Sequence, residues 1–197
     1  MYIENEAALE IYYYMIAVDG EVKQVEMDKF IAILKESDDS ISDMEKDEIK
    51  EELDEFIEIC NQRLETAIDE DEYFEVIKER IDEIKDESVR EWFTYDCIEA
   101  TGLIWNLMSI AVSDKEYSEI EKKLIRYMVR KFQVDKTIYL EMENAMSAIQ
   151  EISKEIDWLK QSNKPYTLIE SVIGTLSERQ KVIFDSVKVL IADSREV

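Results

Sequence analysis

The stretch Ala100-Thr-Gly-Leu-Ile-Trp-Asn-Leu-Met-Ser-Ile-Ala-Val-Ser113 decides the fold of this chain. It carries no charge and no proline, and its apolar side chains point in all directions around a helix. This pattern predicts a helix that is buried on most of its surface. An acidic turn follows the stretch directly, beginning at Asp114.

The same pattern occurs near the N-terminus, where Ala7-Ala-Leu-Glu-Ile-Tyr-Tyr-Tyr-Met-Ile-Ala-Val18 is also followed by an acidic turn. When Asp19 is aligned with Asp114, both copies read Asp-x-Glu-x-x-x-x-Glu without a gap. The carboxylates of the two copies are Asp19, Glu21, Glu26, Asp114, Glu116 and Glu121. The sequence therefore predicts a duplicated helical hairpin.

Composition favours an all-α fold. The 197 residues include only three glycines and one proline, and apolar residues recur at helical spacing. We expect a helical bundle of eight to nine helices built around two pseudo-symmetric hairpins. One of these helices is expected to begin at Ser88 and to continue through the opening stretch. Near the C-terminus, Gly174 is expected to separate a short helix from the last one.

The expected organisation is one domain with a helical tail. The domain spans residues 1–160 and contains an acidic helical insertion at about residues 38–87. The turn-forming segment that ends at Pro165 leads into a C-terminal helical extension, residues 161–197. This extension is too small to hold a core of its own. We expect it to pack on the domain, and a homodimer through these helices is the alternative.

The net charge restricts the partners of the chain. There are 24 basic and 48 acidic residues, which gives a net charge of −24. A surface this negative lacks the clustered Lys and Arg that direct binding to nucleic acid requires, and anionic lipid would repel it. It would attract cations, basic proteins, or proteins that themselves bind nucleic acid. We expect protein partners.

Other features favour a cytoplasmic protein that is not an enzyme. The N-terminus lacks the basic flank and cleavage site of a signal peptide, and the longest uncharged run is too short for a transmembrane segment. Cys60 and Cys97 are isolated, as is usual in a reducing compartment. No histidine, glycine-rich phosphate loop or nucleophilic serine motif is present. We therefore predict no catalytic residues.

The two acidic turns carry a resemblance to a known family. Ile16-Ala-Val-Asp19-Gly20-Glu21 and Ile110-Ala-Val-Ser-Asp114-Lys115-Glu116 resemble the repeated motif of the TerB family, the helical tellurite-resistance domain. The resemblance covers about residues 5–150, and Lys115 departs from the glycine that the family has at this position. It implies an all-helical domain, a divalent metal bound by clustered acidic residues, and a role in stress response or in membrane-associated protein complexes, without established enzymatic activity.

Two interpretations of the six carboxylates remain open. If equivalent turns of the two hairpins face each other, their oxygen atoms can bind a hard divalent cation of the Ca²⁺ or Mg²⁺ type. Alternatively, the aspartates shape the turns, and Glu26 and Glu121 stabilise the first turn of a helix through its dipole and cap.

The leading functional hypothesis is a stress-response and protein-interaction module that binds a divalent cation at the paired turns. The alternative is a metal-free acidic scaffold that recruits a basic partner through the third and fourth helices, which form the acidic insertion at about residues 38–87. A mimic of DNA is a further form of this alternative, because carboxylates at helical spacing can imitate phosphates.

Overall fold

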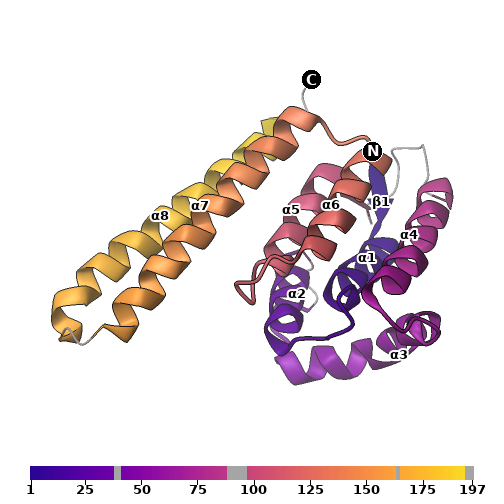
Figure 1. Cartoon of the computed structure of the whole chain (residues 1–197), viewed down its shortest axis with the longest axis horizontal. Coiled ribbons are helices and arrows are strands. Elements are labelled where there is room, and N and C mark those ends of the chain that lie inside the picture. Colours follow the sequence, from indigo (N-terminus) through magenta and orange to yellow (C-terminus); the bar gives the residue numbers. More distant parts are fainter. Residues whose placement is uncertain (38–40, 88–96, 163–164, 194–197) are drawn as a thin grey trace. The chain divides into compact units, whose positions relative to one another are not determined.

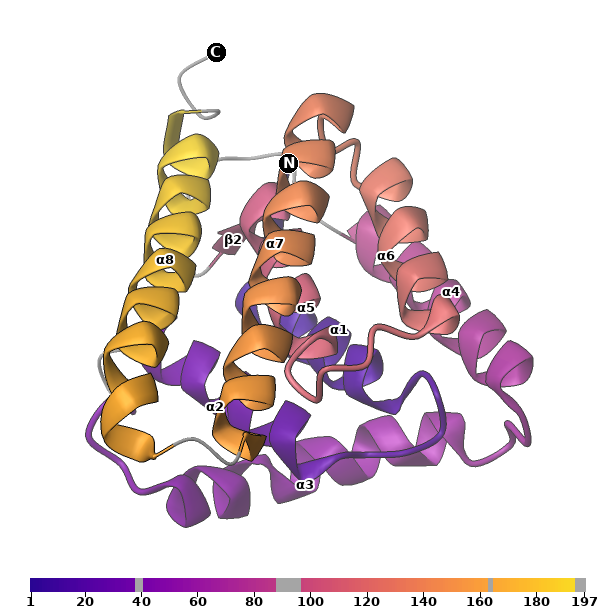
Figure 2. The ribbon, with the colours of Figure 1, turned by 60° about the vertical axis from the view of Figure 1, so that its left-hand side comes forward.

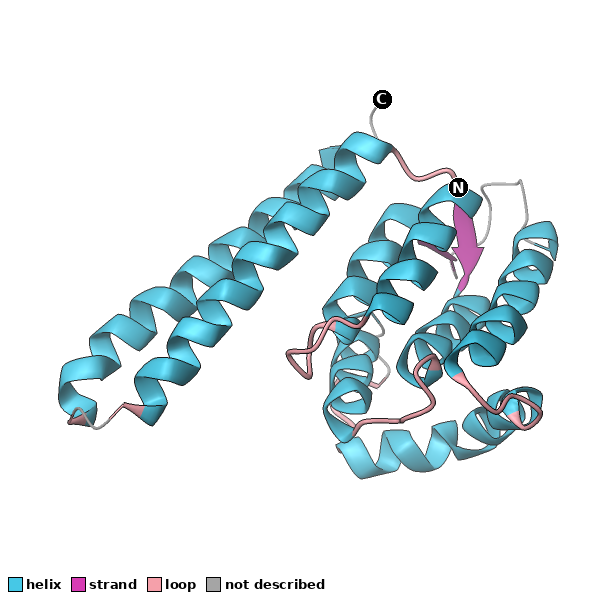
Figure 3. Ribbon diagram, viewed as in Figure 1, coloured by secondary structure: helices cyan, strands magenta, loops and turns pink. Residues whose placement is uncertain are grey.

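The computed structural model describes residues 1–37, 41–87, 97–162 and 165–193. In these residues it contains eight α-helices and one two-stranded sheet (Figure 3), so the predicted all-α fold is confirmed. The chain forms two compact units, Met1–Val134 and Asp135–Val197. The expected domain, residues 1–160, therefore includes the first unit and most of the first helix of the second.

Two helical hairpins form the centre of the first unit (Figure 1). The first consists of α1 (Asn5–Ala17) and α2 (Gln24–Ser37), and the second of α5 (Ala100–Ala111) and α6 (Glu119–Lys131). Helix α5 packs on α1, α2 and α6, and all of its residues except Gly102 and Asn106 are buried. The uncharged stretch is thus the central helix, as its pattern predicts.

A short sheet precedes α5, where a helix was expected. Strand β1 (Tyr2–Glu4) pairs antiparallel with β2 (Cys97–Glu99), and Ile3 lies opposite Ile98. The predicted helix is therefore wrong at Cys97–Glu99, and its first part, residues 88–96, lies outside the described residues. A short apolar segment fits a strand and a helix equally well. Here the backbone bonds to β1 and the complete burial of Ile3 favour the strand.

The segment expected as an acidic insertion contributes to the core of the first unit. Helices α3 (Lys46–Leu64) and α4 (Glu70–Glu87) both pack on α1, and α4 also packs on α6. Their acidic faces are exposed, whereas one apolar stripe of each helix is buried. The buried apolar residues of the two helices are Ile49, Cys60, Leu64, Phe74, Ile77, Ile81 and Ile84.

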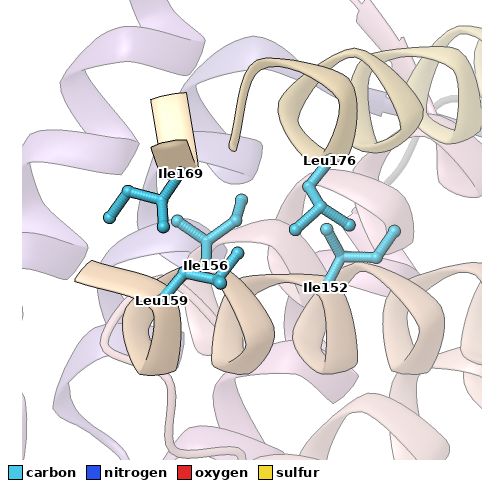
Figure 4. Close-up of a cluster of buried hydrophobic side chains, with 5 residues drawn as sticks. All are labelled: Ile152, Ile156, Leu159, Ile169 and Leu176. Carbon is cyan, nitrogen blue, oxygen red and sulfur yellow. The ribbon is translucent and has the colours of Figure 1, made fainter. Parts of the chain in front are cut away.

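The second unit is a hairpin of two long helices, α7 (Lys136–Gln161) and α8 (Tyr166–Asp193), which lie side by side (Figure 2). Ile152, Ile156 and Leu159 of α7 face Ile169 and Leu176 of α8 (Figure 4). The predicted helix end at Gly174 is wrong, because α8 continues through it. A glycine inside a helix costs only about 1 kcal/mol relative to alanine. Packing against α7 offsets a cost of this size.

Candidate cation site at the paired acidic turns

The loops that join the helices of the two hairpins have the same hydrogen-bonding pattern. In the first loop, Asp19 Oδ1 accepts a hydrogen bond from the backbone N–H of Glu21 at 3.0 Å. In the second, Asp114 Oδ1 accepts the equivalent bond from the N–H of Glu116 at 2.8 Å. Each aspartate therefore uses one carboxylate oxygen to shape its own loop and keeps the other for a further partner.

The residue after each aspartate adopts the left-handed backbone conformation. Gly20 has a φ of 81°, which glycine adopts without strain, and Lys115 has a φ of 74° in the second loop. A left-handed conformation costs a residue with a Cβ about 1–2 kcal/mol. The departure of Lys115 from the glycine at this position therefore leaves the loop geometry unchanged, at a cost in conformational energy.

One ammonium group joins the two loops. Lys23 Nζ lies 2.7 Å from Asp114 Oδ2 and 3.5 Å from Asp19 Oδ2. The side chain of Asp114 is 9% exposed and that of Asp19 is 18% exposed, so both are shielded from solvent. The paired aspartates raise the pKa of Lys23, chiefly through the hydrogen bond from its ammonium to Asp114. A positive charge is thus held where the two hairpins meet.

Two glutamates lie buried near this ammonium. Glu26 is 1% exposed and Glu121 is 3% exposed. The Glu121 carboxylate accepts a hydrogen bond from the backbone N–H of Ser118 at 2.6 Å, and Ser118 Oγ accepts one from the N–H of Glu121. This reciprocal pair is a capping box that begins α6. Glu26 Oε2, by contrast, has no hydrogen-bond partner in the part of the chain that the structure describes.

Burial and neighbouring charges disfavour ionisation of both glutamates. Burial raises the pKa of Glu26 to about 8, and the nearby carboxylates of Glu121 and Asp114 add to this effect. Burial also raises the pKa of Glu121 to about 7, although its hydrogen bonds to Ser118 act in the opposite direction. Near pH 7, Glu26 therefore retains its proton in most molecules, while Glu121 is divided between its two forms.

The structure brings together four of the six predicted carboxylates. Asp19 and Asp114 share one ammonium, and Glu26 and Glu121 lie within electrostatic reach of them. The other two, Glu21 and Glu116, have exposed side chains, and the described hydrogen bonds to the aspartates come from their backbone. Among all the described residues, no group of three or more acidic, Cys or His side chains is placed so that it could hold a metal ion.

Sequence reasoning missed Lys23, the residue that holds the two loops together. One signal was available, because Lys23 is the only basic residue among the first 28 residues of the chain, where there are seven acidic ones. A lone cation between two acidic motifs has many carboxylate partners within reach. Its position in the loop alone, however, does not indicate that it would contact Asp114 in the other hairpin.

A second buried ion pair was also missed, at Glu10 in the middle of α1. Arg80 of α4 donates to both of its carboxylate oxygens at 3.0–3.1 Å, Arg63 of α3 donates to one, and Tyr14 OH donates at 2.8 Å. Glu10 is the single charge within an apolar run, which indicates a buried partner. This network fixes α3 and α4 to α1 and has a structural role.

The four gathered carboxylates suit a hard cation. Ca²⁺ and Mg²⁺ prefer carboxylate oxygens, and these side chains supply oxygen donors only. The buried Glu26 Oε2 has no hydrogen-bond partner among the described residues, so it is available to a further ligand. In their described positions these side chains do not form a metal site, so they could hold a divalent ion only after they move closer together and the Lys23 ammonium leaves Asp19 and Asp114.

Residues 5–144, more than half of the chain, match the family model described as tellurite resistance protein TerB. The chain belongs to the TerB family. The match runs from α1 into α7, so the TerB region includes both hairpins and all six predicted carboxylates. Among curated proteins and among solved structures, none matches the chain. No described helix of this TerB protein is both long and apolar enough to cross a membrane.

Proposed function

We propose that this TerB protein is a non-enzymatic stress-response and protein-interaction module that binds a divalent cation of the Ca²⁺ or Mg²⁺ type. The proposed ligands are Asp19, Glu26, Asp114 and Glu121. One observation carries the proposal: the buried, unpartnered Glu26 Oε2 lies near two aspartates that already share a positive charge. In this proposal the module is cytoplasmic and acts through protein partners.

The proposed mechanism is exchange of one cation for another. In the absence of metal, the Lys23 ammonium partly neutralises Asp19 and Asp114, and Glu26 keeps its proton. A divalent ion held by Asp19, Glu26, Asp114 and Glu121 would supply more positive charge than the ammonium and would favour the ionised form of all four carboxylates. Because Glu26 and Glu121 must lose their protons, cation binding releases protons and is stronger at pH 8.5 than at pH 6.

Cation binding would affect other proteins through the position of the first loop. Asp19 shapes this loop, and Gly20 next to it packs near Tyr73 of α4. Release of Lys23 from Asp114 removes a link between the two hairpins. The loop and the surface beside it therefore differ between the cation-free and cation-bound forms, which gives a partner two surfaces to distinguish.

Thermal unfolding of chelator-treated protein tests the proposal. Ca²⁺, Mg²⁺, Mn²⁺ and Zn²⁺ are added in separate titrations, because a ligand that binds only the folded state stabilises it by about 2.7 kcal/mol at a hundred times its Kd. We expect a saturable rise in Tm with one cation. The rise is expected to disappear in the double variant Asp19→Asn, Asp114→Asn.

The double variant Glu21→Gln, Glu116→Gln is the matched control. It removes the same formal charge from the same two motifs, but from exposed side chains. It is expected to retain the cation response. A flat response in all proteins, or an equal response in both double variants, would contradict the proposed site and leave the turns as helix caps.

The second candidate function is a metal-free scaffold that recruits a basic protein through α3 and α4. The exposed acidic faces of these two helices favour it. Binding through such a surface weakens as salt is added, since salt screens exposed charges. It does not respond to chelators, which separates it from the cation-dependent function.

A further inference from the structure

A groove with a volume of about 810 Å³ lies beside the first acidic loop. Its walls come from this loop, from one face of α3, and from the first turn of α4. Apolar side chains in it include Val22, Ile57 and Tyr73, and the carboxylates are Asp54, Glu58 and Glu65. The groove lies entirely within the first unit and does not include the four proposed cation ligands.

The groove combines exposed apolar surface with negative charge. Val22 is 51% exposed although it is apolar, and Ile57 is half-buried. All three carboxylates are exposed, and no lysine or arginine is among the described residues that line the groove. A concave surface with an apolar part and one sign of charge is typical of a binding site.

The three carboxylates lie along one face of α3 and its C-terminal end. Asp54 and Glu58 are four residues apart, and Asn61, Gln62 and Glu65 continue the same face of the helix and its end. This stripe extends over about 16 Å at 1.5 Å per residue. A helix that lies alongside α3 has the same rise per residue, so basic side chains one turn apart on that helix can meet successive carboxylates.

From this geometry we infer that the groove binds a basic amphipathic helix of a partner protein. Lysine or arginine side chains of the partner pair with Asp54, Glu58 and Glu65, and its apolar side chains contact Val22 and Ile57. The inference deepens the protein-interaction part of the proposed function and rests on that part alone, because none of these contacts requires a bound cation.

The groove is nevertheless adjacent to the cation site. Gly20 and Val22, which follow Asp19 in the first loop, both line the groove. A Cβ atom at Gly20 would lie 3.5 Å from the Tyr73 ring, so the loop and the wall of the groove are in close proximity. A change at Asp19 therefore alters one wall of the groove, which provides a physical link between the cation and the partner.

A binding titration with a designed peptide tests the inference on the full chain. The probe is a fluorescent peptide of about 18 residues with leucines at i, i+3, i+4 and i+7 and lysines or arginines elsewhere. We expect saturable binding, and binding about tenfold weaker in the triple variant Asp54→Asn, Glu58→Gln, Glu65→Gln. The control triple variant Glu52→Gln, Glu55→Gln, Glu79→Gln removes the same charge from exposed positions outside the groove and is expected to bind normally.

A pair of valines tests the apolar part of the groove. Val22→Ser is expected to weaken peptide binding several-fold, whereas Val25→Ser is expected to leave it unchanged. The two side chains are equally exposed, at 51% and 52%, but only Val22 lines the groove. A peptide of the same composition in scrambled order is expected to bind more weakly than the amphipathic one.

Three results would overturn the inference: no binding of the peptide, equal weakening by both triple variants, or equal binding of the scrambled peptide. Either of the last two results would show that the peptide binds through unspecific charge attraction and not in the groove. The thermal response of the triple variants to divalent cations is measured in parallel. That response is expected to be unaffected, so a failure of the groove can be distinguished from a failure of the cation site.

Discussion

The two acidic loops have nearly the same backbone but differ in which groups stabilise their shielded carboxylates. In the second loop, Ser118 and Glu121 form a complete capping box, so the buried glutamate has partners. In the first loop the position of Ser118 is taken by Lys23, whose ammonium extends to both aspartates. The glutamate of that loop, Glu26, is left with an unpartnered oxygen.

The two copies share the geometry of their loops but differ in the partners of their buried glutamates. In the second copy the buried Glu121 is hydrogen-bonded to Ser118 of the same copy at the start of α6, although Asp114 of this copy also contacts Lys23 of the first. In the first copy, Lys23 reaches across to Asp114 of the other hairpin, and the buried Glu26 has one oxygen, Oε2, without a hydrogen-bond partner among the described residues. Any response to cations or to pH should therefore originate mainly in the first loop.

The largest expected difference between the loops concerns their buried glutamates. The pKa of Glu26 is raised from 4.5 to about 8, so the native protein keeps a proton that the unfolded chain loses in this range. The free energy of unfolding of the cation-free protein therefore falls as pH rises from 4.5 to 8. Glu26→Gln should abolish this part of the fall and stabilise the protein at pH 9 by about 5 kcal/mol, with little effect at pH 4.

Urea unfolding at several pH values measures this difference, and Glu121→Gln is the matched variant. Its effect should be smaller, because the pKa of Glu121 is raised only to about 7 and its hydrogen bonds to Ser118 stabilise the ionised form. If the two variants gave the same pH dependence, Glu26 and Glu121 would be electrostatically equivalent, and the proposed difference between the two loops would be wrong.

The next difference concerns the residues at the start of the second helix in each hairpin. Lys23→Met removes the ammonium from between two aspartates and should destabilise the cation-free protein by about 2 kcal/mol at pH 7. This is below the 3–5 kcal/mol typical of a broken buried pair, since Lys23 is partly exposed. Ser118→Ala removes one capping hydrogen bond and should cost about 1 kcal/mol. Chemical denaturation of both variants at low salt provides the comparison.

High salt sharpens this prediction. Screening should reduce the cost of Lys23→Met, since that cost is electrostatic, and should leave the cost of Ser118→Ala nearly unchanged. A cost for Lys23→Met that is independent of salt would indicate that its methylene groups matter through packing, and the ammonium would lose its assigned role.

The smallest expected difference is in the backbone. Gly20→Ala places a Cβ on a left-handed residue and should destabilise the protein by about 1 kcal/mol, since the added atom itself would only make an ordinary contact with Tyr73. Lys115→Gly relieves the same strain in the second loop and should stabilise the protein by several tenths of a kcal/mol. Thermal unfolding measures both, and a loss of stability in Lys115→Gly would show that its side chain contributes more than its backbone costs.

Much of the fold could be predicted from local patterns, and the site only in part. The uncharged stretches identified α1 and α5, and the repeated acidic spacing identified the two equivalent loops, because both signals lie within short segments. The strand at Cys97–Glu99 could not be predicted, since it depends on pairing with β1 (Tyr2–Glu4), which lies far away along the sequence. The long α8 was missed because the local cost of Gly174 was judged without the packing on α7.

In the candidate site, too, local signals could be predicted and features that depend on long-range packing could not. The spacing indicated that the aspartates of the two loops could come together, and Asp19 and Asp114 do share one ammonium. It could not separate the buried Glu26 from the exposed Glu21, because which side chain faces inward depends on the packing of α2 against α5. Nor could it indicate Lys23, whose partner Asp114 lies 91 residues away along the chain.

The central claim is that Lys23 occupies the position that a divalent cation would take. Calorimetric titration of the cation that stabilises the wild type, into wild type and Lys23→Met at pH 7.5, tests it most directly. Removal of a competing ammonium should strengthen cation binding at least tenfold, about 1.4 kcal/mol. Unchanged or weaker binding in Lys23→Met would contradict the claim, because it would show that the ion and the ammonium do not share one position.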